Sequence, residues 1–372
     1  MNDIFKMNKL FAIVTFTFIT LATYSQVSKY SNEFLAVGVG GRALGMSNSV
    51  IASVQDASAG YWNPAGLVNC EAPRQLFLMH SEYFAGIAKY DNISFAALTN
   101  DSAAISFSYI RFGVDDIPNT TELIDAQGNI NYDRITTFSA IDNAFLVSYS
   151  RRLPITNLNV GANLKIIRRT VGEFGGSWGF GIDAGAQYKK DDWRFGAVLR
   201  DVTSTFNAWS FTLDDATKDV FTLTGNEIPE NSLELTMPRL LLGAGRKFNI
   251  SNSFAIYPEM GMDITFDGKR NVLLKTNVFS ADLHAGFELN YNNVAYLRGG
   301  IGNIQKETNF DGKKTTTLQP NMGVGIRIKD IMQIDYAFTD LGDVSVALYS
   351  HVFSLVFNIR PKNYSNSIHP SI

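Results

Sequence analysis

Apolar and polar residues alternate along most of this chain. In the segment 318–329, for example, the apolar residues Met322, Val324 and Ile326 are separated by single small or polar residues. Successive side chains of a β-strand point to opposite faces of its sheet, so this pattern predicts a strand with one apolar face. Residues 332–339 repeat the pattern after a very short turn, which predicts an antiparallel hairpin.

Fourteen segments show this pattern, and most reach the roughly 9–11 residues that a tilted strand needs to cross a bilayer. A soluble β-sandwich also alternates, but its strands are usually shorter. An even number of strands allows the sheet to close, as it must in hydrocarbon, where an open edge finds no hydrogen-bond partner. The predicted strands are 75–81, 91–98, 102–111, 142–152, 156–170, 175–189, 192–202, 238–248, 253–267, 279–291, 293–303, 318–329, 331–340 and 349–359.

The connections between these strands also alternate in length. Those after every second strand, from the second to the twelfth, span one to four residues, whereas three others cover residues 112–141, 203–237 and 304–317. Outer-membrane barrels have short periplasmic turns and longer extracellular loops. The predicted fold class is therefore all-β: a 14-stranded antiparallel transmembrane β-barrel with an N-terminal plug segment and both termini on the periplasmic side.

The first 25 residues have the features of a removable signal peptide. Lys6 and Lys9 precede the apolar run 10–22, and the small residues before Gln26 suit a signal peptidase. The alternative is a membrane anchor, but the run is shorter than the roughly 20 residues of a spanning helix. The sequence thus predicts a protein exported to the cell outer membrane. Its predicted parts are a signal peptide (1–25), a plug or periplasmic segment (26–73), the barrel (74–359) and a tail (360–372).

Composition excludes several functional classes. The 372 residues carry a formal net charge of −3, so the chain offers no basic face for nucleic acid. One cysteine and four scattered histidines give no zinc-like spacing, and we predict neither a metal site nor a cofactor. Acyl-transfer chemistry would require a serine, a histidine and a carboxylate to converge, and His284 is the only histidine predicted to face the barrel interior. We therefore predict no catalytic residues and no enzymatic activity.

Residues 26–73 do not alternate cleanly, so this segment must do something other than form the wall. The run 38–43 formally matches a dinucleotide-binding pattern, but no βαβ unit surrounds it. Asn63 and Pro64 suit the N-cap and first position of a short helix. Many of the remaining residues are glycine or alanine, which would allow close packing inside a barrel lumen.

Two runs in this segment resemble a known family. G-G-R-A-L-G-M at 40–46 and D-A-S-A-G-Y-W-N-P-A-G-L at 56–67, placed before fourteen strands, are similar to the PorV/PorQ family of Bacteroidota outer-membrane proteins, which is related to FadL-like barrels. The resemblance implies a lumen plug and an association with type IX protein secretion, in which such barrels bind secretion-machinery or cargo proteins. It also implies plug roles for five residues, namely Arg42, Asp56, Asn63, Pro64 and Gly66.

Charged residues also fall on the polar faces of the predicted strands. Inside a barrel they are expected to form salt bridges that replace solvation and hold the plug. Arg42 of the plug is expected to pair with one of two such carboxylates, Asp335 or Glu288. The predicted lumen charges are Lys165, Asp183, Glu288, Arg298, Arg327 and Asp335.

Two functions remain open at this stage, and both have outer-membrane lipid as a partner. The first is the binding of secretion partners or cargo, favoured by apolar residues in the predicted long loops: Ile117, Pro118, Phe206, Trp209 and Phe211. The alternative is a FadL-like channel for uptake of hydrophobic small molecules. A plugged lumen would then need a side opening in the wall, and glycines between residues 175 and 181 would permit a strand to bend there.

Overall fold

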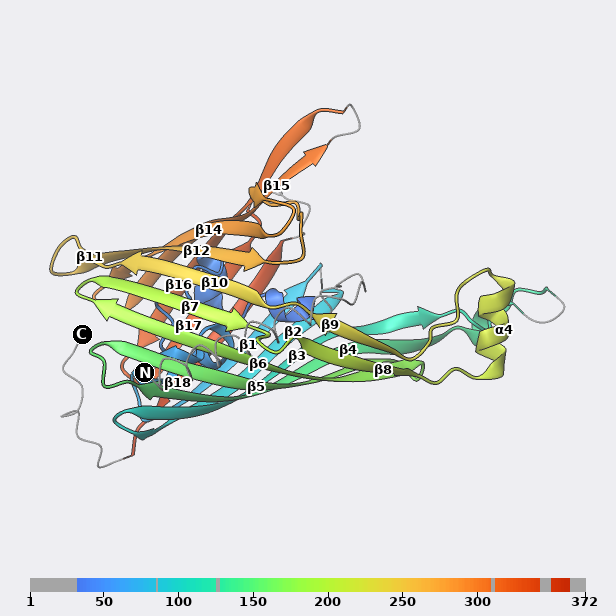
Figure 1. Ribbon diagram of the computed structural model, residues 1–372, viewed down its shortest axis with the longest axis horizontal. Coiled ribbons are helices and arrows are strands. Elements are labelled where there is room, and N and C mark those ends of the chain that lie inside the picture. Colours follow the sequence, from blue (N-terminus) through green and yellow to red (C-terminus); the bar gives the residue numbers. More distant parts are fainter. Residues whose placement is uncertain (1–31, 85, 125–127, 309–311, 342–348, 362–372) are drawn as a thin grey trace, which may run out of the picture.

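The computed structural model describes residues 32–84, 86–124, 128–308, 312–341 and 349–361. The predicted signal peptide and nearly all of the predicted tail lie outside these residues. The described chain forms one antiparallel sheet that closes into a barrel, with short helices of the N-terminal segment inside it (Figure 1). Closure is made by the first and last strands, with Leu78 opposite Leu355.

The helical elements are η1 (Glu33–Ala36), α2 (Gly41–Gly45), α3 (Ala59–Trp62), η2 (Pro64–Asn69), η3 (Tyr132–Arg134) and α4 (Asp215–Leu223). The strands are β1 (Arg74–Tyr83), β2 (Ala88–Asn100), β3 (Ala103–Asn119), β4 (Thr136–Arg152), β5 (Leu158–Val171), β6 (Gly175–Lys190), β7 (Trp193–Arg200), β8 (Thr205–Phe211), β9 (Ser232–Thr236), β10 (Arg239–Arg246), β11 (Phe248–Asn249), β12 (Phe254–Thr265), β13 (Leu274–Lys275), β14 (Ser280–Tyr291), β15 (Ala295–Thr308), β16 (Lys314–Ile328), β17 (Met332–Thr339) and β18 (Ser350–Ile359).

The barrel wall has fourteen strands, as the sequence predicts. β7 and β8 pair with successive parts of β6, so they are two halves of one wall strand, interrupted at 201–204. β10 and β9 pair with β7 and β8 in the same way, and Met237 and Pro238 separate them. β11 and β13 are two-residue strands that add no wall position. The interruptions have a local cause, since Asp201 and Ser204 have positive φ and proline donates no backbone hydrogen bond.

The predicted long loops are partly wrong. β3 continues to Asn119 and β4 begins at Thr136, and the predicted loop 203–237 contains β8, α4 and β9. These strands extend beyond the rest of the barrel towards α4, and the hairpin of β15 and β16 projects separately (Figure 1). We call the projecting parts of β3–β6, β8 and β9, together with α4, the extension. Inward-facing aromatic residues of the extension pack on one another.

The wall is apolar outside and polar inside. Phe107, Leu164 and Val324 point outward and are exposed, whereas Ser108 and Asn163 point inward and are buried. This is the reverse of a soluble protein and suits a barrel surrounded by hydrocarbon. It agrees with the faces predicted from the alternation. Within the described residues, no helix has the length and apolar character needed to span a bilayer.

The N-terminal segment fills the barrel interior by direct contact of its backbone with inward glycines of the wall. A Cβ atom at Gly161 would lie 2.5 Å from the carbonyl carbon of Pro64, and one at Gly286 would lie 2.4 Å from the carbonyl oxygen of Met46. The plug also has its own apolar core, in which Val39 and Leu67 are completely buried. Glycines on the inner face of the wall therefore provide the space that the plug occupies.

Candidate functional site

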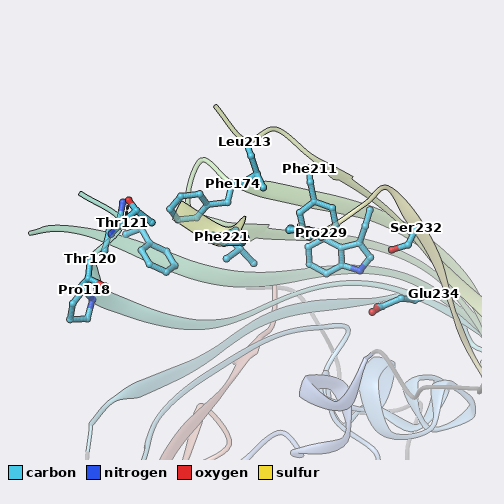
Figure 2. Close-up of a pocket in the computed structure, with 14 residues that line it drawn as sticks. Pro118, Thr120, Thr121, Phe174, Phe211, Leu213, Phe221, Pro229, Ser232 and Glu234 are labelled. Atoms are coloured by element: carbon cyan, nitrogen blue, oxygen red, sulfur yellow. Dashed lines mark hydrogen bonds between the residues drawn. The ribbon is translucent and has the colours of Figure 1, made fainter. Parts of the chain in front are cut away.

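A cavity of about 520 Å³ lies in the extension, bounded by the inward faces of its strands and by α4 (Figure 2). The lining is mainly aromatic and aliphatic. Ser232 and Glu234 of β9 lie at one end, while Pro118, Thr120 and Thr121 lie at the other (Figure 2). We call this cavity the outer pocket.

Strand alternation places the outer-pocket residues of β8. Trp209 and Phe211 lie two residues apart and so share the inner face, whereas Phe206 points outward and is exposed. In the β8–β9 pairing Trp209 is opposite Ser232. On the other side of β8, a Cβ atom at Gly175 of β6 would lie 2.6 Å from the Phe211 ring. Gly175 therefore makes room for an aromatic side chain of the pocket rather than bending the wall.

Aromatic contacts hold the pocket walls in place. The rings of Phe138 and Phe174 meet edge-on with centroids 5.2 Å apart, and those of Trp209 and Phe211 stack at 5.6 Å. Phe221 of α4 lines another part of the pocket. Such pairs are favourable beyond the area they bury. Packed aromatic side chains thus define the walls of this apolar pocket.

The helix that carries Phe221 is capped at its start. The Asp214 carboxylate accepts a hydrogen bond of 2.7 Å from the backbone N–H of Thr217. Hydrogen bonding by the Thr217 side chain, together with this backbone bond, lowers the pKa of Asp214. An N-cap of this kind satisfies a backbone donor that otherwise has no partner within the helix. The cap therefore helps to fix α4 over the pocket.

A charged layer lies at the barrel side of the outer pocket. The guanidinium of Arg169 lies over the Trp209 ring at 5.1 Å and donates to the Asp142 carboxylate at 2.7 Å. Its Nη1 is also 3.7 Å from Oε2 of Glu234. A ligand that moved from the pocket towards the plug would therefore leave an apolar surface for a polar one.

The plug begins immediately beyond this layer. Asn32 accepts a hydrogen bond from Asn207 at 3.1 Å and donates one to Thr236 at 2.9 Å. Arg200 donates to the carbonyl oxygens of Leu35 and Tyr61, each at 3.2 Å. The space among these residues is about 20 Å³, which suits a water molecule but not an organic ligand.

The five predicted plug residues all lie inside the barrel. The Arg42 side chain is 3.0 Å from the Glu288 carboxylate, one of its two predicted partners. Asp56 accepts from the Ser58 backbone at 2.8 Å, and Asn63 donates to the Ala186 carbonyl at 3.0 Å. Pro64 is the first residue of η2, and a Cβ atom at Gly66 would lie 2.2 Å from the Val54 carbonyl oxygen.

The predicted lumen charges form two clusters and one separate pair. Arg298 is fully buried and donates to both Glu288 and Asp335 at 2.7 Å. Lys165 pairs with Asp183 at 2.8 Å and also with Asp201 of the β7–β8 interruption. Arg327 makes a separate ion pair with Glu71 at 3.1 Å, and Gln333 links it by hydrogen bonds to Asp335 of the first cluster. The inward placement of these charges follows from alternation, but their grouping depends on strand register.

Sequence reasoning missed one polar cluster. Ser49 Oγ lies 2.8 Å from His284 Nδ1, and His284 Nε2 lies 3.4 Å from Asp263 Oδ1. A serine, a histidine and a carboxylate thus converge around His284, the one histidine predicted to face the interior. Ser49 is completely buried, however, and neither cavity described above is lined by any of the three. The cluster joins the plug to the wall, since Ser49 belongs to the N-terminal segment and His284 and Asp263 to strands β14 and β12.

No protein-family model and no curated protein sequence matches this chain. Solved structures do share its fold. The monoaromatic hydrocarbon channel CymD has a TM-score of 0.55 at 16% identity, over 87% of this chain and 98% of CymD. The toluene transporter TodX of Pseudomonas putida gives 0.54 at 12%, over 90% and 100%. A FadL homologue of Pseudomonas aeruginosa gives 0.50 at 12%, over 86% and 97%.

Identities this low establish a shared fold and nothing finer. The chain has the architecture of FadL-like outer-membrane barrels, and its apolar exterior agrees with a position in the outer membrane. The FadL-like part of the predicted resemblance is thus supported. The comparisons give no support to the PorV/PorQ family in particular.

Proposed function

We propose that this protein is an outer-membrane channel that captures a hydrophobic small molecule in the outer pocket and passes it inward. The observation that carries the proposal is the aromatic pocket in the extension of a FadL-like barrel. Pockets of about 300–1,000 Å³ are typical of small-molecule sites. The volume of about 520 Å³ therefore suits an organic molecule of one or two rings. Proteins of the same fold include channels and transporters of hydrocarbons, which supports the same chemical class here.

Passage requires the first residues of the plug to move. Asn32 and Leu35 lie directly between the outer pocket and the rest of the plug, and polar hydrogen bonds hold them. Hydrogen bonds of this kind exchange for bonds to water with a small net change in free energy. The backbone contacts at Gly161 and Gly286 have no such replacement. Movement near residue 32 is thus easier than expulsion of the whole plug.

The proposal retains the predicted organisation of the chain. Residues 1–25 would be a signal peptide, 26–73 a plug, 74–359 the barrel and 360–372 a tail. The extension would face the cell exterior and the short turns the periplasm, as in other outer-membrane barrels. The outer pocket would then be the first part of the protein that an external ligand meets.

A role in type IX secretion was the leading expectation from the sequence. Its basis is the resemblance to the PorV/PorQ family, and the apolar residues in presumed loops, which would need a partner to cover them, add support. In the structure Trp209 and Phe211 line the outer pocket, and Pro118 lies at its end. Because those side chains are accounted for by a cavity of ligand size, uptake of a small molecule explains them better.

The test compares two substitutions in α4. Phe221→Asp places a charge in the outer pocket, whereas Leu223→Asp alters a residue that is 85% exposed on the same helix and does not line the pocket. We expect uptake of labelled toluene by reconstituted vesicles to fall by about tenfold or more in Phe221→Asp, because an apolar site disfavours a charge. Leu223→Asp is expected to match the wild type. Equal uptake by both variants would contradict the proposal.

A further inference from the structure

The polar end of the outer pocket gives information about the ligand that the apolar walls do not. We infer that the pocket selects an apolar molecule bearing a hydroxyl group, whose oxygen accepts from Trp209 Nε1–H and whose proton is donated to Glu234. This inference rests on the proposed function and makes it more specific.

The first observation is an unpaired donor. Nε1 of Trp209 is buried and has no hydrogen-bond partner among the residues that the structure describes. A buried indole N–H usually has one, because it loses its hydrogen bond to water on burial. The ring contacts the Phe211 ring and the Arg169 guanidinium, and neither of these contacts uses the N–H at the ring edge. Trp209 lines the pocket, so a bound molecule can supply the missing acceptor.

The second observation is a carboxylate oxygen on the neighbouring strand that accepts no hydrogen bond. Oε2 of Glu234 is buried and accepts no hydrogen bond from any described residue, although Arg169 Nη1 lies 3.7 Å away. In the β8–β9 register Trp209 is opposite Ser232, and Glu234 is two residues further along β9 on the same face. Both Trp209 and Glu234 also contact Arg169, so the donor and the acceptor belong to one small region of the pocket.

The combination of one donor and one acceptor discriminates among ligand classes. A hydroxyl group both accepts and donates, so it can satisfy Trp209 and Glu234 together. A hydrocarbon satisfies neither. A carboxylate has no proton for Glu234 and brings a second negative charge beside it. An ammonium group can donate to Glu234 but offers no lone pair to Trp209. A phenol or an alcohol is therefore the ligand class that fits this end of the pocket.

The test uses two probes of nearly the same size and shape, p-cresol and p-xylene, which differ by a hydroxyl in place of a methyl group. Binding to the purified full-length protein in detergent is measured by calorimetry. We expect p-cresol to bind about tenfold more tightly, as befits one or two buried hydrogen bonds. Trp209→Phe keeps an aromatic ring but removes the N–H, and is expected to reduce that preference to about threefold or less. Trp178→Phe, on the outer wall, is the matched control and should keep it.

The outcomes separate the inference from the function on which it rests. Equal affinity for p-cresol and p-xylene in the wild type would overturn the inference, because water would then satisfy Trp209 and Glu234, while uptake of apolar molecules would still stand. A full preference in Trp209→Phe would overturn it as well. Failure of the wild type to bind either probe would contradict the proposed function itself. The wild-type comparison needs no variant to fold.

Discussion

The outer pocket and the lumen are formed by the same strands but lined by different kinds of side chain. In the extension, the inner face of β8 carries Trp209 and Phe211, which bound an open cavity. Closer to the barrel centre the same face carries Thr205 and Asn207, both completely buried against polar partners. The contrast teaches that one continuous wall provides an apolar site for capture and a tightly packed polar plug without any change of fold.

The two regions also differ in what would disrupt them. The lumen depends on buried ion pairs and on contact of the plug backbone with wall glycines. The pocket depends on aromatic packing and on the position of α4. Substitutions in one region should therefore leave the other largely unchanged.

Arg298→Ala is expected to have the largest effect. It would leave Glu288 and Asp335 buried without their shared partner, which destabilises a protein by about 3–5 kcal/mol. The measurement is thermal unfolding of the detergent-solubilised barrel, followed by its heat-modifiable migration in gels. Arg327→Ala is the matched control, because Arg327 is partly exposed and its ion pair is with Glu71, which is also partly exposed. Equal unfolding temperatures for the two variants would contradict the claim that the Arg298 ion pairs stabilise the barrel.

Gly300→Val tests the backbone contact between plug and wall. A Cβ atom there would lie 2.4 Å from the Met46 carbonyl carbon, and overpacking of this kind usually costs about 1–3 kcal/mol. We expect a loosened plug and a higher ion conductance in planar bilayers, with unchanged p-xylene binding in the outer pocket. Gly299→Val is the control, since its Cβ would meet only the Phe287 side chain on the outer face. A conductance no higher than that of Gly299→Val would count against a close-packed plug.

Asp214→Ala should have the smallest effect, confined to the extension. Loss of the cap frays α4 and is expected to weaken p-xylene binding by roughly two- to fivefold. Because the cap lowers the pKa of Asp214, its contribution is complete above about pH 4 and is lost as the pH falls through the folded-state pKa. Asp214→Asn retains a capping side chain and should bind nearly as the wild type does. Weaker binding by Asp214→Asn than by Asp214→Ala would exclude this role of the cap.

The fold was predictable because alternation depends only on neighbouring residues. The period-two pattern of 318–329 identifies both the strand and the side that faces lipid, and fourteen such segments define the barrel. The strand predicted to end at residue 202 resumes at Thr205, and this continuation was missed because the break, at which Asp201 and Ser204 have positive φ, resembles the end of a strand.

The candidate site was only partly predictable. Trp209 and Phe211 stood out as apolar residues in a presumed loop, and their alternation across 205–211 was a signal for a strand. Phe138, Phe174 and Phe221 gave no comparable signal, because they approach one another only through the pairing of β4 with β5, β5 with β6 and β6 with β8, and through the folding back of α4. Such a cavity is determined by strand register and tertiary packing. Neither of these can be read from a local pattern in one sequence.

The most direct test of the account is to locate a ligand in the protein. Crystals of the full-length protein soaked in bromobenzene would show the bromine by its anomalous scattering. The account predicts a bromine peak in the outer pocket, among Phe138, Phe174, Trp209 and Phe211. Bromine found only at the lipid-facing wall, with none in this cavity, would contradict the claim that the outer pocket captures apolar molecules.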